Sequence, residues 1–170
     1  ANNTATDTDQ PAALVTISKV SLGGTGAFGF TGSNGIAAQT LTTTVAATQV
    51  TGAAQALTAL GTATTITEGV PPAGYALTGI SCSGLPGGTA TPDLAARTVT
   101  LDAAATASGA NITCTFTNTR APQLRLQKSL PNGRAVASDQ FTLNMTGMAS
   151  VTTAGTGSTA TGVLVHSGAT

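Results

Sequence analysis

Apolar and polar residues alternate in short runs along most of the chain, and turn-forming residues separate the runs. Successive side chains of an extended strand point to opposite faces, so each run predicts a β-strand with one buried face. The predicted strands cover residues 14–21, 27–31, 40–50, 62–70, 75–82, 97–101 and 111–119. One stretch, 49–60, is rich in Ala and Leu and could instead form a short helix. Dense β-branched residues and regularly spaced turns predict an all-β sandwich.

The pattern of the first strand returns later in the chain. Segment 122–130 resembles segment 14–22. Each carries a lysine, Lys128 in the later segment and Lys19 in the earlier one, on the strand face that otherwise holds apolar side chains. The run 141–145 then echoes the phenylalanine strand of the first copy. This repeat predicts a complete β-sandwich domain at 12–120 and the first part of a second, similar domain at 121–170. Residues 1–11 are polar and end at Pro11, so we expect a flexible N-terminal arm there, or alternatively an edge strand. We expect the second copy to be completed either by further chain or by another subunit.

Three polar residues fall on the buried phase of predicted strands: Lys19, Glu68 and Asn118. The apolar residues on the same faces are Val15, Ile17, Ile66, Val70, Ile112, Cys114 and Phe116. A buried lysine, carboxyl group and carboxamide are costly unless they contact one another. The alternation therefore predicts that the three side chains meet in the core.

Each of these residues also has an ordinary explanation. Lys19 could extend from a strand end and keep its ammonium in water. Glu68 could end its strand at the glycine that follows, and Asn118 could be a turn residue before the second copy. Asp102, at the end of the strand 97–101, is an alternative acyl partner for the lysine.

Composition excludes several classes of function. Charged residues make up only 7% of the chain and the formal net charge is zero. The six Lys and Arg residues are scattered singly, so we expect no nucleic-acid partner. No apolar run approaches the roughly 18 residues of a membrane-spanning helix, so we expect no membrane insertion. An almost uncharged surface also gives little electrostatic protection against self-association.

Cysteine usage indicates the compartment. Cys82 and Cys114 are the only cysteines, and both lie on apolar phases. Structural metal sites usually need four ligands. The two thiols and the distant His166 supply only three, so we expect no metal and no cofactor. A disulfide between them is the favoured prediction, and two buried free thiols are the alternative. A disulfide implies an oxidising, extracytoplasmic setting.

Three motifs resemble one known family. Residues 67–75 (Thr-Glu-Gly-Val-Pro-Pro-Ala-Gly-Tyr) resemble the glutamate box of the collagen-adhesin B-type domain, also called the SpaA-type or prealbumin-like domain. Ile-Ser-Lys-Val at 17–20 resembles the lysine strand of that family, and Phe-Thr-Asn-Thr at 116–119 resembles its closing asparagine strand. The likeness implies a Greek-key, immunoglobulin-like sandwich that occurs as tandem repeats in large bacterial surface or filament proteins.

The same resemblance implies a chemical role for the three buried polar residues. In this family a lysine and an asparagine on neighbouring strands join through an isopeptide bond. Here Lys19 would be the nucleophile, Asn118 the acyl group and Glu68 the proton shuttle, with Lys128 as the equivalent nucleophile of the second copy. Burial would lower the pKa of Lys19 toward the neutral, nucleophilic amine. The event happens once per molecule, so we expect no enzyme.

Together these features predict a structural subunit or stalk module of an extracellular bacterial filament or cell-surface fibre. We expect a homopolymer formed through β contacts between subunits, with the arm at 1–11 and the open edges of the second copy as candidate contacts. The alternative is an adhesin-type module that binds a host or matrix ligand. Scarce aromatic and Arg residues leave no evident binding hot spot for it.

Overall fold

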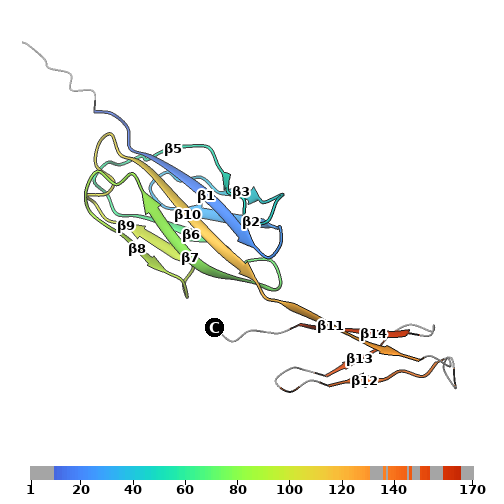
Figure 1. Cartoon of the computed structure of the whole chain (residues 1–170). Helices are drawn as coiled ribbons and strands as arrows, with labels where there is room; N and C mark the ends of the chain where they lie inside the picture. The colour runs from blue at the N-terminus through green and yellow to red at the C-terminus, as the bar shows by residue number, and fades with distance from the viewer. Residues whose placement is uncertain are drawn as a thin grey trace, which may run out of the picture. The chain divides into compact units, whose positions relative to one another are not determined.

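The chain divides into two compact units, which we describe separately. The computed structural model describes residues 10–130, 136, 138–144, 146, 150–153 and 159–165. The first unit ends at Arg120 and the second begins at Ala121 (Figure 1). Residues 1–9, which make up most of the predicted arm, lie outside the described residues. The arm ends at Pro11, whose carbonyl accepts hydrogen bonds from the loop before the last strand of the unit.

One sheet of the first unit has its first and last strands at the centre. The strand order is β4-β1-β10-β7, and β5 also pairs with β1. The strands are β1 (Leu14–Leu22), β4 (Val50–Thr51), β5 (Gln55–Ala56), β7 (Tyr75–Ser83) and β10 (Asn111–Arg120). β1 and β10 run parallel, whereas the other pairs are antiparallel. Because parallel neighbours cannot be joined by a tight hairpin, the chain between them builds the rest of the unit.

The second sheet of this unit is antiparallel throughout and has the order β3-β2-β6-β9-β8. Its strands are β2 (Ala27–Gly32), β3 (Gln39–Thr42), β6 (Thr64–Glu68), β8 (Ala90–Asp93) and β9 (Thr98–Leu101). The central strand β6 alternates regularly between buried and half-buried residues, and its last residue, Glu68, is on the buried phase. The glutamate therefore points between the sheets rather than into solvent.

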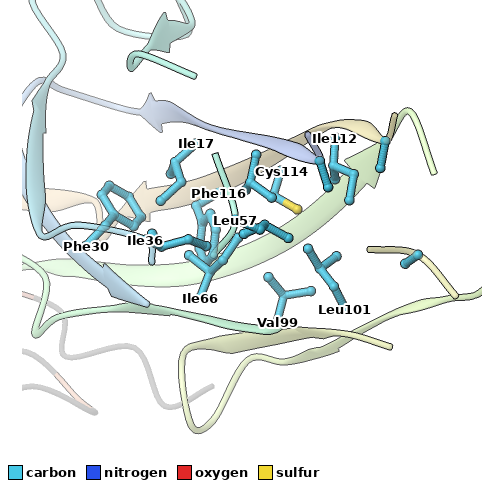
Figure 2. Packing of buried hydrophobic residues seen from close by; sticks show 14 of the residues in the cluster. Ile17, Phe30, Ile36, Leu57, Ile66, Val99, Leu101, Ile112, Cys114 and Phe116 are labelled. Carbon is cyan, nitrogen blue, oxygen red and sulfur yellow. The ribbon is translucent and has the colours of Figure 1, made fainter. Parts of the chain in front are cut away.

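The core lies between the two sheets. Figure 2 shows Ile17 and Phe116 of one sheet facing Ile66 and Val99 of the other, and all four are at most 1% exposed. These residues are the apolar phases of their strands, so burying them drives the two sheets together. None of the described residues lies in a helix, so the prediction of an all-β sandwich is confirmed.

The strand pattern was wrong in the middle of the unit. The run 40–50 is not one strand, because β3 ends at Thr42 and the chain turns at Ala47, whose φ is 61°. The stretch 49–60 forms β4 and β5 instead of a helix. The Gly52 amide donates to the Ile17 carbonyl of β1, and the Leu57 amide donates to the Ala13 carbonyl just before β1. β8 was not predicted, because it is a four-residue edge strand that contains a proline.

The described part of the second unit also contains β-strands. β11 (Gln123–Ser129) pairs antiparallel with β14 (Thr159–Val165). β12 (Thr142–Leu143) pairs with β13 (Val151–Thr152). Lys128 lies on β11, as Lys19 lies on β1. His166 lies outside the described residues.

Candidate functional site

Lys19, Glu68 and Asn118 come from three strands and meet in the core of the first unit. Lys19 lies on β1, Asn118 on the neighbouring strand β10, and Glu68 at the end of β6 in the opposite sheet. Their exposed fractions are 0%, 1% and 0%. Lys19 therefore does not extend its ammonium into water, and Asn118 is not a turn residue.

The three side chains form a closed set of hydrogen bonds. The Nζ of Lys19 donates to Oε1 of Glu68 at 2.6 Å and also to Oδ1 of Asn118. The Nδ2 of Asn118 donates to the other carboxyl oxygen of Glu68, Oε2, at 3.1 Å. Each oxygen of the carboxyl group therefore contacts a different nitrogen, and this arrangement compensates for the burial of all three polar groups.

Aromatic rings surround the lysine nitrogen. The centre of the Phe28 ring lies 4.1 Å from Nζ, and that of Phe30 lies 6.0 Å away. The Phe30 ring packs edge-on against Phe116, with 5.1 Å between ring centres. The sequence pattern placed both rings of β2 on a strand but did not assign them to the site. Phe28 and Phe30 are two positions apart, so both side chains lie on the same, buried face of the strand. That spacing is the signal in the sequence that could have placed them at the site.

Burial and hydrogen bonding act in opposite directions on the lysine. Removal of the ammonium from water lowers the pKa of Lys19 from its ordinary value, and the hydrogen bond and negative charge of Glu68 partly oppose that shift. Glu68 is the titratable side chain that contacts the Lys19 nitrogen. The site can therefore present a lysine that loses its proton more readily than one in water.

Asp102, the alternative acyl partner, is engaged elsewhere. Its carboxylate accepts hydrogen bonds from the Ala105 amide at 2.9 Å, the Thr89 hydroxyl at 2.9 Å and the Thr89 amide at 2.8 Å. These bonds lower the pKa of Asp102, with the Ala105 amide as the largest cause. Asp102 organises a surface loop, and the acid beside Lys19 is Glu68.

The two cysteines form a disulfide that joins β7 to β10. Cys82 and Cys114 lie directly opposite each other in the antiparallel register of these strands, with 4.1 Å between their Cα atoms. Cys114 is fully buried and belongs to the hydrophobic core. The bond therefore fixes the edge strand β7 to the strand that carries Asn118.

Lys128 has a related but different environment. The residue is exposed, and its Nζ lies 4.8 Å from the centre of the Phe141 ring. A lysine nitrogen therefore faces a phenylalanine ring in both units. The role of Lys128 as the nucleophile of the second copy stays a prediction.

Other types of site find no support among the described residues. No three His, Cys, Asp or Glu side chains of that part of the chain gather where they could hold a metal ion. No helix there is long and apolar enough to cross a membrane.

Comparisons with known proteins add a family relationship. A sequence profile of the SpaA type, described as a prealbumin-like fold domain, matches residues 15–120. A second SpaA-type profile with the same description matches residues 123–170. No curated protein and no solved structure matches the chain. The first match runs from the second residue of β1 to the end of β10, and so it includes Lys19, Glu68 and Asn118.

Proposed function

Because the chain belongs to the SpaA-type family of prealbumin-like domains, we propose that it is a structural module of an extracellular filament or surface stalk, closed internally by an isopeptide bond. The observation that carries this proposal is the buried, closed contact of Lys19, Glu68 and Asn118. Domains of this family are non-enzymatic modules typical of surface pilus proteins. The disulfide supports an oxidising, extracellular setting.

The proposed reaction joins Lys19 to Asn118 with loss of ammonia. The neutral amine attacks Cγ of Asn118, the bond from Cγ to Nδ2 breaks, and an amide forms between the two side chains. Glu68 accepts the proton of the amine through Oε1 and delivers a proton to the departing Nδ2 through Oε2. The hydrogen bonds at 2.6 and 3.1 Å lie along that proton path. Folding supplies the proximity, so one event occurs per molecule.

The position of the bond supports a mechanical role. It would link the first and last strands of the unit, which run parallel at the centre of one sheet. A force applied at the two ends of the unit would pass from β1 to β10 through the covalent bond. The residues between Lys19 and Asn118 would then carry no tension, and the unit would stay folded while it is pulled.

Intact mass tests the proposal directly. The purified, folded protein should weigh about 17 Da less than its sequence requires, in addition to the hydrogens lost in the disulfide, because one ammonia leaves. Peptide mapping should recover the Lys19 and Asn118 peptides joined. Glu68→Gln should keep the full mass, since its side chain has the same shape but no carboxyl group to relay protons. An unmodified wild-type mass, or a cross-link that persists in Glu68→Gln, would contradict the proposed reaction.

We also propose that copies of the chain associate through the edge strand β7. Its nine residues contain no charge and no proline, and Cys82 holds it to β10. The other sheet edges of the first unit are less suitable for pairing: β3 has four residues, β4 and β5 have two each, and β8 contains Pro92 and Asp93. Short strands, prolines and charges at an edge discourage strand addition. β7 lacks all three.

Analytical ultracentrifugation over a range of concentrations tests this association. Ser81→Lys places a charge on β7, so two paired edges would bring like charges together and the assembly should weaken. Thr100→Lys is the matched control, because Thr100 is also exposed but lies on β9 inside the other sheet. Equal weakening by both variants would argue against β7. Deletion of residues 1–11 tests separately whether the arm contributes.

A further inference from the structure

The Phe28 ring is the nearest aromatic group to the reacting nitrogen. Its centre lies 4.1 Å from Nζ of Lys19, within the range in which the face of a ring attracts a cation. Phe28 is 1% exposed, so water screens the attraction very little. The attraction acts on the ammonium and is lost when the nitrogen gives up its proton.

The Phe28 ring is held in place by Tyr75. Tyr75 packs edge-on against Phe28 at 5.4 Å, and its hydroxyl donates a hydrogen bond to the Thr25 carbonyl at 3.0 Å. Gly24 makes room for this hydroxyl, since a Cβ at that position would lie 2.6 Å from it. The turn between β1 and β2 therefore fixes the ring over the lysine.

We propose that Phe28 is a positioning residue of the cross-linking site: its ring holds the Lys19 ammonium beside Glu68 and Asn118 and restrains the loss of the proton that must precede attack. The inference rests on the proposed isopeptide reaction. Phe28 favours the ion pair of Lys19 and Glu68, which stabilises the folded chain before the bond forms. The same preference reduces the population of the neutral amine and slows bond formation.

The direction of the effect separates this role from simple packing. If Phe28 only filled space, its replacement would loosen the site and slow the reaction. If it holds the ammonium, Phe28→Leu keeps the site apolar, favours the neutral amine and speeds the reaction. Loss of the ring should lower the pKa of Lys19 further and raise the rate up to about tenfold.

Phe30 provides a matched control on the same strand. It is equally buried, but its ring centre lies 6.0 Å from the lysine nitrogen. The attraction of a charge to a ring quadrupole falls with about the cube of distance, so Phe30 exerts roughly one third of the effect of Phe28. Phe30→Leu should therefore shift the pKa of Lys19 much less than Phe28→Leu.

Two measurements on the full chain test the proposal. The first is the pKa of Lys19 by NMR in an Asn118→Ala background, where no bond can form, with Phe28→Leu or Phe30→Leu added. The second is the rate of ammonia loss, followed by mass after unreacted chain is diluted from denaturant into native buffer at neutral pH. Pentafluorophenylalanine at position 28 keeps the ring shape while reversing its quadrupole. It should act like Phe28→Leu on both readouts even if the leucine variant folds poorly.

The outcomes are distinguishable. A lower pKa together with a faster reaction in the position-28 variants, and a small effect in Phe30→Leu, supports the assignment. An unchanged pKa, a slower reaction in the fluorinated variant, or equal effects at the two positions overturns it. A wild-type chain that never loses ammonia refutes the proposed cross-link, whereas the hold of Phe28 on the ammonium is still decided by the pKa measured in the Asn118→Ala background.

Discussion

Removal of the proposed Lys19–Asn118 cross-link, without a buried charge left behind, should lower the stability of the first unit by a predictable amount. Lys19→Met combined with Glu68→Gln removes both ionisable groups, and the new carboxamide at position 68 keeps a possible hydrogen bond to Asn118. The pair of changes avoids the penalty of one unpaired buried charge, which alone can reach about 3–5 kcal/mol. The stability difference from wild type then reports the covalent bond.

The magnitude depends on the length of the loop that the bond closes. Lys19 and Asn118 are 99 positions apart in sequence. Closing a loop of that length in the unfolded chain contributes about 5 kcal/mol on the chain-entropy model. For a domain of this size, such a change corresponds to a fall in Tm of at least ~20 °C.

Thermal and urea denaturation followed by circular dichroism measure the change. The unfolding free energy of the wild type should also depend less steeply on urea concentration than that of the double variant. The reason is that the proposed bond keeps a loop of the unfolded wild-type chain closed, so that less surface is exposed on unfolding. Lys128→Met is the control, since that lysine is exposed and lies in the second unit. A double variant within about 1 kcal/mol of wild type would refute the reasoning.

Three further predictions concern the first unit. Cys82→Ser combined with Cys114→Ser removes the disulfide, which closes a loop with a sequence separation of 32. The free energy of unfolding, measured by urea denaturation, should fall by about 4 kcal/mol. A fall of less than 1 kcal/mol contradicts this prediction. Asp102→Asn should make the unfolding free energy depend less on pH at acid pH. The pKa of Asp102 is lower in the folded than in the unfolded chain, where it is near 4, so the carboxylate contributes stability that is lost as the pH falls through its folded-state pKa. An unchanged pH dependence in the variant refutes this. Gly84→Ala should lower Tm, because Gly84 has φ of 77° and an added Cβ would lie 2.0 Å from a backbone carbonyl; Gly87→Ala, with open space around it, is the control and should leave Tm unchanged.

Local alternation was enough to identify the strands that build the site. Lys19, Glu68 and Asn118 each share a face with apolar neighbours, so the phase of each strand assigned them to the core. The phase was wrong for Val70, which is 85% exposed because β6 ends at Glu68 and not at residue 70. The high cost of isolated buried polar groups then required that they meet. The structure brings them together, although no local pattern contains information on the distances among three strands.

Features that depend on partners far away in the chain were not predictable from local pattern. β4 and β5 exist because the long central strand β1 supplies hydrogen bonds to a segment whose Ala and Leu content also suits a helix. The placement of Phe28 over the lysine depends on the turn at Gly24 and on Tyr75, 47 positions later in the chain by residue number. Such arrangements are set by tertiary contacts that override or supplement local propensity.

The parallel pairing of β1 with β10 also fixes a direction for the module. Because the two strands point the same way, the chain enters the first unit where β1 begins and leaves it at the opposite pole, where β10 ends. An antiparallel pair would have returned both ends to one pole. β1 alone spans about 30 Å at the usual rise of a strand. The first unit is therefore directional: chain that precedes β1 and chain that follows β10 attach to it at opposite poles, separated by at least the length of β1.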